Sequence, residues 1–311
     1  MIEKHWLSYQ DQVTLLEARG LSIADSDTAA EFLSRVNYYR ASGYFRYWQL
    51  DLSGGDNRFI PGSTFETIQR LYKDEQALVL ICDEVLHPIE VILRTRFAHY
   101  YAHRMSTIGG FATGEGFTQS PNSASERVEE RALENLDRSK ETFVAYYRDE
   151  IKGGSHYSLE AYARMPIWVV VEAFSFGSLS RLIEASKESG VLADLADSMK
   201  VSPATLPSQV RSFVYLRNGI AHCAKLWNHF VLDVPGLLPN ISRRAKRKHQ
   251  QFSDHSIFKI FVALDDVATK AGVAHNWLSD RVDPILKANP ILAAGITNPA
   301  KYGEMSSELL T

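Results

Sequence analysis

The sequence feature that most constrains the fold is a long run of helical periodicity from Thr64 to about Met105. Apolar residues recur there every three or four positions, which is the spacing of one face of an α-helix. Pro88 falls inside the run and lacks a backbone N–H, so a kink or a helix restart is expected there. No segment of any length alternates apolar and polar residues as a half-buried strand would, although short strands near Leu50 or Val231 are compatible with the pattern. The sequence therefore predicts an all-α fold.

Other periodic segments extend this prediction to most of the chain. Helices are expected at Asp11 to Arg19, Asp27 to Tyr39, Glu126 to Asp149, Pro166 to Ser189, Ser208 to His229, Asp254 to Ala271 and Ala274 to Ala288. The stretch from Gly109 to Ser125 is rich in small and polar residues and is expected to form a mobile loop. We predict three parts: an N-terminal helical segment over residues 1–62, a helical bundle over 63–290 and a C-terminal tail over 291–311.

The composition is that of an ordinary globular protein. The 311 residues allow a sizeable core, and 45% hydrophobic and 23% charged residues are close to average usage. Cys82 and Cys223 are the only cysteines, too few for a disulfide framework and typical of a reducing compartment. No run approaches the roughly 20 apolar residues that span a bilayer, and the start of the chain lacks the apolar core of a signal peptide. We expect a cytoplasmic protein without membrane contact.

Arg217, Asn218 and His222 point most directly to a chemistry. In a helix over this region, the polar face would carry Arg211, Tyr215, Asn218, His222 and Lys225, opposite an apolar stripe of Phe213, Leu216, Ile220, Ala224 and Trp227. Arginine neutralises charge on a phosphate, histidine transfers protons near neutral pH, and an amide orients one of them. The set suits cleavage of RNA without a metal. The alternative is a solvated helix face with an ordinary surface histidine.

Several segments, in order along the chain, resemble one protein family. They are the run from Tyr9 to Leu21, Phe32–Tyr44, Ile89–Thr95, Met165–Ser180 and Arg217–Asn228. The last segment has the R-x4-6-H signature in its R-N-x3-H form. Together they resemble the Abi-like family of abortive-infection proteins (the AbiD/AbiF type), which belongs to the HEPN superfamily of helical ribonucleases. The resemblance implies a HEPN-type helical bundle with an N-terminal helical extension.

The same resemblance implies an endoribonuclease toxin of anti-phage defence that uses neither metal nor cofactor. The 2′-hydroxyl of the RNA would attack its own phosphate and leave a 2′,3′-cyclic phosphate. His222 would act as general acid or base, Arg217 would stabilise the transition state, and Asn218 would position the histidine or the phosphate. One histidine per chain is a poor acid–base pair, so a homodimer is expected. An antitoxin or a regulatory RNA is expected to restrain the toxin.

Two other classes of function stay open. A non-catalytic HEPN module would bind RNA or a protein partner through the same helix face. A helix-turn-helix regulator would bind duplex DNA through residues 1–60, although the arginines there lie among aromatic residues and mark no clear recognition helix.

A second R-x4-H motif, from Arg94 to His99, lies in the long periodic segment. Apolar residues crowd it, and no asparagine follows the arginine. We therefore interpret Glu90, Arg94 and His99 as supporting groups near the site. The alternatives are a composite active site that includes this motif, and a plain Glu90–Arg94 ion pair. His99 and His103 have a helical metal-ligand spacing, but no acidic or cysteine partner completes a set, so no metal site is predicted.

Glu172 lies in the otherwise apolar run from Ile167 to Phe174. A carboxylate buried there must find a partner or shift its pKa. We expect Glu172 to support Arg217, His222 or Arg94. The alternatives are an ion pair elsewhere, or a helix face more exposed to water than the sequence indicates.

A net charge of -3 gives no general attraction to nucleic acid, so contacts with RNA must be local. The basic run from Arg243 to His249 suits phosphate contacts, and the alternative is a solvated turn or helix start. The predicted RNA-binding residues are Lys225, Arg243, Arg244, Lys246, Arg247 and Lys248. The segment from Tyr38 to Trp48 interleaves aromatics with arginines. We interpret it as a packed helix junction, with base stacking as the alternative.

Overall fold

The computed structural model describes residues 5–51, 54–119, 127–148 and 159–310. Over these residues the regular secondary structure is almost entirely helical, and the one sheet is an antiparallel hairpin of β1 (Gln49–Asp51) and β2 (Asp56–Phe59). The all-α prediction is confirmed, together with the short strand expected near Leu50. Val231 lies outside the described strands. No helix in these ranges is long and apolar enough to cross a membrane.

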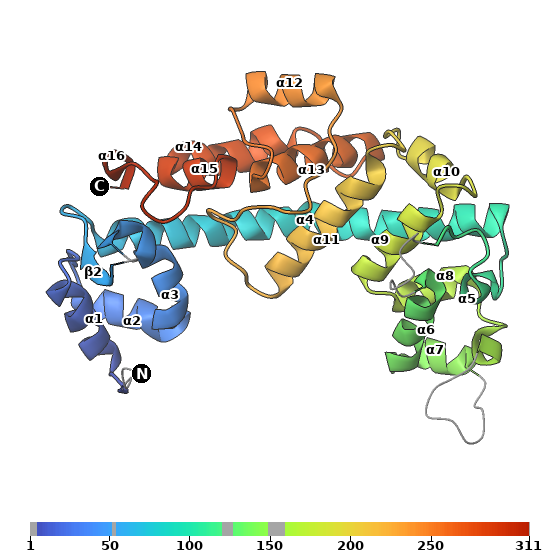
Figure 1. Ribbon diagram of the computed structural model, residues 1–311, viewed down its shortest axis with the longest axis horizontal. Coiled ribbons are helices and arrows are strands. Elements are labelled where there is room, and N and C mark those ends of the chain that lie inside the picture. Colours follow the sequence, from blue (N-terminus) through green and yellow to red (C-terminus); the bar gives the residue numbers. More distant parts are fainter. Residues whose placement is uncertain (1–4, 52–53, 120–126, 149–158, 311) are drawn as a thin grey trace.

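One 40-residue helix, α4 (Phe65–Arg104), runs along most of the molecule and forms its spine (Figure 1). It begins where the Thr64 hydroxyl accepts the N–H of Thr67 at 3.2 Å, which is an N-cap. The helix continues through Pro88 without the predicted restart. The restart does not occur because a proline removes only one helical hydrogen bond, while the buried side chains of Leu86 and Ile89 keep the helix packed on either side.

The N-terminal segment packs at one end of α4 (Figure 1). It comprises α1 (Tyr9–Ala18), α2 (Ser26–Val36), α3 (Tyr38–Phe45), the 3-10 turn η1 (Arg46–Trp48) and the hairpin. The helix predicted from Asp27 to Tyr39 is broken at Asn37, whose φ of 66° lies in the left-handed region. The Asn37 side chain then accepts the N–H of Tyr39 at 2.8 Å and starts α3.

The aromatic segment from Tyr38 to Trp48 forms the packed junction that the sequence predicts. Its buried aromatic residues are Tyr44, Phe45, Tyr47 and Trp48. The Trp48 indole N–H donates to the Leu310 carbonyl at 2.8 Å, so the last described turn of the chain packs onto the N-terminal segment. Tyr39, Arg40 and Arg46 are exposed.

Shorter helices from the middle of the chain lie at the other end of α4 (Figure 1). They are α5 (Gly110–Thr113), α6 (Val128–Arg138), α7 (Thr142–Tyr147), the 3-10 turn η2 (Leu159–Tyr162), α8 (Ile167–Ala173), α9 (Phe176–Ala185) and α10 (Val191–Ser198). The helices predicted over 126–149 and 166–189 are each divided in two; in the second, the Ser175 hydroxyl accepts the N–H of Ser178 at 3.1 Å and starts α9. Part of the expected loop over 109–125 forms α5, and its residues 120–125 lie outside the described ranges. α10 has no counterpart among the predicted helices.

The C-terminal helices complete the core along α4. α11 (Leu206–Ala221) crosses α4 obliquely, and α13 (Ile257–Ala271) packs against both (Figure 1). The other elements are α12 (Pro239–Lys248), the π-helical turn η3 (Leu278–Val282), α14 (Asp283–Ala288), α15 (Pro290–Thr297) and α16 (Ser307–Leu310). The stretch predicted as a tail, 291–311, therefore contains packed helices, and the division of the chain into three parts stays a prediction.

The carboxylate of Glu75, fully buried on α4, joins this helix to two distant parts of the chain. One of its oxygens accepts the backbone N–H groups of Leu226 at 2.5 Å and Trp227 at 2.8 Å, and the other accepts the hydroxyl of Tyr44. The Trp227 ring stacks on Tyr44 at 6.0 Å and on Trp48 at 5.8 Å. A buried carboxylate is costly unless it is hydrogen-bonded, and these donors satisfy it.

Replacing Glu75 with alanine is expected to lower the free energy of unfolding by about 3 kcal/mol or more, because two backbone N–H groups and a phenol lose their buried acceptor. Urea unfolding followed by circular dichroism measures this change. Glu84→Ala on the same helix is the control, since its half-exposed ion pair with Arg281 is worth less than about 1 kcal/mol. Equal losses in the two variants would contradict the anchoring role of Glu75.

Candidate active site

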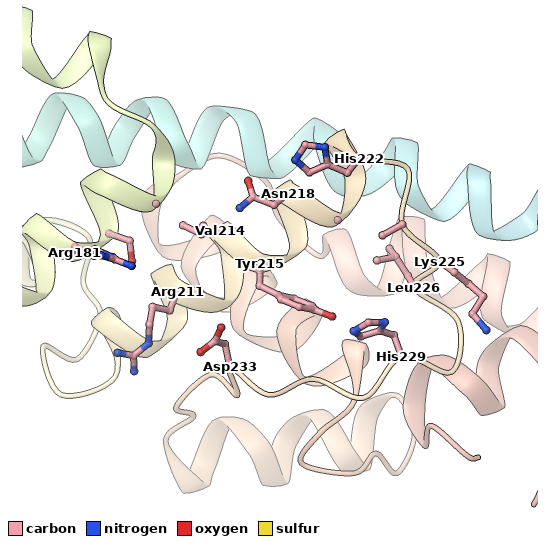
Figure 2. Close-up of a pocket in the computed structure, with 14 residues that line it drawn as sticks. Arg181, Arg211, Val214, Tyr215, Asn218, His222, Lys225, Leu226, His229 and Asp233 are labelled. Atoms are coloured by element: carbon pink, nitrogen blue, oxygen red, sulfur yellow. The ribbon is translucent and has the colours of Figure 1, made fainter. Parts of the chain in front are cut away.

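Arg217 and Asn218 lie on the last turn of α11, and His222 follows that turn directly. The helix ends at Ala221: the His222 N–H still donates to the Asn218 carbonyl at 3.0 Å, and the next residue adopts a left-handed φ of 52°. The prediction of a helix as far as His229 is therefore wrong. Asn218 and His222 nevertheless lie beside each other at the end of the helix (Figure 2).

A cleft of about 490 Å³, which we call the His222 cleft, opens beside this helix end and includes Asn218 and His222 in its wall (Figure 2). Its other charged and aromatic lining residues are Arg181 from α9, Arg211 and Tyr215 from α11, and Lys225, His229 and Asp233 from the segment after α11. The wall thus carries three cations and two imidazoles against one carboxylate. Such a surface favours an anionic group such as a phosphate.

Arg217 does not line the cleft, because its side chain lies against α4. Its Nε is 3.4 Å from Oε2 of Glu90, its guanidinium lies 5.8 Å from the ring centre of Phe176, and 31% of the side chain is exposed. Glu90 also forms an ion pair with Arg94, so one carboxylate holds both arginines. Arg94 in turn donates to two backbone carbonyls at the end of α8. The structure thus places Glu90 and Arg94 next to Arg217, and their supporting role stays a prediction.

Two predicted supporting residues lie elsewhere. His99 is exposed on α4, and its ring centre lies 5.0 Å from that of Tyr100. It points away from the side of α4 that carries Arg94, because a separation of five residues turns about 140° around a helix. Glu172 is exposed on α8, so the expectation of an embedded carboxylate is wrong, and that helix face contacts water. Neither side chain lines the His222 cleft.

The basic run predicted to bind RNA forms the C-terminal half of α12. It lines a separate cleft with Asn240, to which Arg243, Lys246 and Arg247 contribute. Arg244 lies 3.8 Å from the carboxylate of Asp266 on α13. Lys225 instead lies in the segment after α11 and donates to the Gly43 carbonyl at 2.9 Å. Of the predicted RNA-binding residues, the structure brings only Lys225 to the His222 cleft.

Sequence reasoning missed several residues of the cleft. Arg181, His229 and Asp233 come from another helix and from an irregular segment, and only the tertiary fold brings them together. Arg211 and Tyr215 did carry a signal, because helical periodicity puts them on the face of Asn218 and His222. In the structure Arg211 also pairs with Glu184 of α9 at 2.8 Å.

Burial shifts the ionisation of Tyr215 and His229, whose ring centres lie 5.5 Å apart (Figure 2). Burial, with the charge of Asp233, raises the pKa of Tyr215 to about 12. Burial, with the charge of Lys225, lowers the pKa of His229 below its ordinary value. At neutral pH the phenol can therefore donate a hydrogen bond, and the imidazole is uncharged and able to accept a proton.

The side chains of the His222 cleft offer acid–base and electrostatic chemistry. The exposed imidazole of His222 is accessible to a substrate, and the same wall carries cations that can hold a charged group. Within the described ranges, no group of three or more His, Cys, Asp and Glu residues is placed to hold a metal ion.

Residues 31–228 match the model of a protein family described as Abi-like protein. The match spans more than half of the chain and includes the last turn of α11, His222 and Glu90. No curated protein and no solved structure matches the chain.

In an NMR titration of the histidine ring protons, His229 is expected to take up a proton at a more acidic pH than a histidine in unfolded protein. Lys225→Met should raise the pKa of His229, because it removes a neighbouring positive charge. The pKa should still stay below the ordinary value, since burial is the larger cause. Titration of His229 at or above the ordinary value in the unmodified protein would contradict its burial in the cleft.

Proposed function

Because the chain belongs to the Abi-like protein family, we propose that it is an endoribonuclease toxin of abortive-infection defence against phage. The family supports the defence role. The nuclease assignment depends on one observation, the position of His222: an exposed imidazole beside Asn218, on the wall of a cleft rich in cations. A histidine in such a setting suits proton transfer on a phosphodiester.

In the proposed reaction, the 2′-hydroxyl of bound RNA attacks the adjacent phosphorus. A bond forms between O2′ and phosphorus while the bond from phosphorus to O5′ breaks, which leaves a 2′,3′-cyclic phosphate and a free 5′-hydroxyl. His222 accepts the proton of the attacking hydroxyl or donates one to the leaving oxygen. Arg217, oriented by Glu90, stabilises charge on the phosphate oxygens, and Asn218 positions His222 or the phosphate. No step of this reaction requires a metal.

The reaction needs a second proton-transfer group besides His222. In a homodimer with two-fold symmetry, that group would be His222 of the second copy, and two-fold symmetry is the commonest arrangement of oligomers. Within one chain, His229 lies on the same cleft, and burial keeps it neutral at pH 7. We propose the homodimer as the source, with His229 as the alternative within one chain.

The proposal also includes partners. A toxin of this kind must be restrained in a growing cell, so we propose an antitoxin or a regulatory RNA as its inhibitor. The cations of α12 line a cleft separate from that of His222, and they would hold phosphates of an RNA that extends beyond the cleavage site.

The packing of Arg217 favours a second candidate function, a non-catalytic module that binds RNA or a protein partner. The guanidinium is held between Glu90 and the ring of Phe176, and it does not line the His222 cleft. An arginine in this position can stabilise the end of α11 without touching a substrate. Under this alternative, RNA binds but is not cleaved.

Purified protein incubated with total RNA is expected to produce new 2′,3′-cyclic phosphate and 5′-hydroxyl ends, which chemical mapping of the ends detects. His222→Ala should slow cleavage by roughly 10²- to 10⁴-fold, and Arg217→Ala by roughly 10²-fold or more. His87→Ala, an exposed histidine on α4, is the control and should cleave as the unmodified protein does. If the RNA stays intact, or if all variants cleave it equally, the nuclease proposal is rejected and the non-catalytic binding module is favoured.

If the partner copy supplies the second proton-transfer group, His229→Ala should keep its cleavage rate within about 10-fold, while analytical ultracentrifugation shows a dimer. A monomeric protein whose cleavage falls as far in His229→Ala as in His222→Ala would overturn the homodimer. His229 would then be the second group.

A further inference from the structure

A second cleft, which we call the α3 cleft, is lined mostly by the N-terminal segment and shares Lys225 with the His222 cleft. Its volume is about 340 Å³. The side chains that matter for its chemistry are those of Tyr39, Arg40, Arg46, Lys225 and Tyr302. They come from α3, η1, the segment after α11 and the stretch before α16. Three cations and three aromatic rings, counting the buried ring of Tyr44, thus surround one hollow that has no carboxylate in its wall.

The two arginines of the α3 cleft have no described acidic partner. Other exposed arginines of the N-terminal segment are paired: Arg35 forms an ion pair with Glu31, and Arg58 with Asp56. In the described ranges, no ion pair involves Arg40 or Arg46. Arginines that share a cleft without a carboxylate are suited to bind an anion.

The aromatic rings of the α3 cleft are exposed, unlike those of the packed junction beside it. Tyr39 is 81% exposed and Tyr302 is 45% exposed, whereas Tyr44 and Trp48 are buried with their polar tips hydrogen-bonded. The guanidinium of Arg46 lies 6.0 Å from the ring centre of Tyr302. An exposed ring beside an arginine is the arrangement that stacks a base and holds its phosphate.

The α3 cleft is adjacent to the proposed cleavage site. Lys225 lines both clefts. Arg40 donates to the backbone carbonyl of Cys223, the residue directly after His222. A chain of nucleotides that leaves the His222 cleft on this side would therefore meet the exposed rings and arginines of α3 and η1.

We propose that the α3 cleft is a binding subsite for single-stranded RNA next to the scissile phosphate. Tyr39 and Tyr302 stack unpaired bases, and Arg40 and Arg46 hold the phosphates between them. The ligand is a single strand because only unpaired bases expose their faces to protein side chains. The choice of RNA rests on the proposed function, but the cleft itself does not depend on cleavage.

The test uses the full-length His222→Ala protein, so that RNA stays intact, and a fluorescent single-stranded RNA oligonucleotide followed by anisotropy. Tyr39→Ala in this background should weaken binding by roughly 5- to 150-fold, the range for removal of one base stack. Tyr146→Ala removes a tyrosine that is also 82% exposed but lies on α7, so it is the matched control and should bind as the parent does.

Arg46→Glu tests the binding of phosphates. It should weaken binding and reduce the slope of log affinity against log salt by roughly 0.7 for each phosphate that the variant no longer neutralises. Arg138→Glu is its control, because Arg138 is 79% exposed on α6, at the other end of α4. Circular dichroism of all variants verifies that the fold is unchanged.

The outcomes separate the subsite from the nuclease. If the unmodified protein cleaves no RNA but Tyr39→Ala and Arg46→Glu still weaken binding, the subsite holds and the nuclease fails. If RNA is cleaved but both variants bind as their controls do, the subsite is overturned and the nuclease holds. Equal affinity for duplex RNA, or no binding of any oligonucleotide, also overturns the subsite.

Discussion

The buried carboxylate of Glu75 is the interaction on which the candidate site depends. It accepts hydrogen bonds from Tyr44 of α3 and from the backbone of Leu226 and Trp227, so three distant parts of the chain meet at one side chain. Burial raises the pKa of Glu75, and the hydrogen bonds oppose that shift. Because Lys225 precedes these two residues and His229 follows them, the position of both side chains in the His222 cleft is fixed from α4.

A second carboxylate on α4, that of Glu90, pairs with Arg217 near the C-terminal end of α11. Glu75 and Glu90 are 15 residues apart, which corresponds to about 22 Å along a helix and about 60° around it. Glu75 holds the segment after α11, and Glu90 holds Arg217 within α11. A single continuous helix thus positions both the end of α11 and the chain that leaves it.

Helical periodicity predicts which segments are helices, but it does not predict where they end. The common sequence signals for a helix end are a glycine or a proline, whereas α11 ends where Cys223 adopts a left-handed φ, and α2 ends where Asn37 does. The burial of Glu75 could have been predicted, since it interrupts the apolar stripe of α4. Its partners could not, because they are more than a hundred residues away or on another helix. Arg181 and His229 reach the cleft only through tertiary packing, which no local pattern reveals.

Lys225 couples the His222 cleft to the α3 cleft, because it lines both. Burial lowers its pKa to about 8, while the charge of Glu75 opposes that shift. Its ammonium lies 4.6 Å from the ring centre of Tyr47 and 5.4 Å from that of Trp227, contacts that favour the charged form. Loss of the proton above pH 8 removes one cation from both clefts at once, whereas the arginines keep their charge. A strand bound across both clefts, as we propose, would therefore lose one cationic contact above pH 8 while it kept those of the arginines.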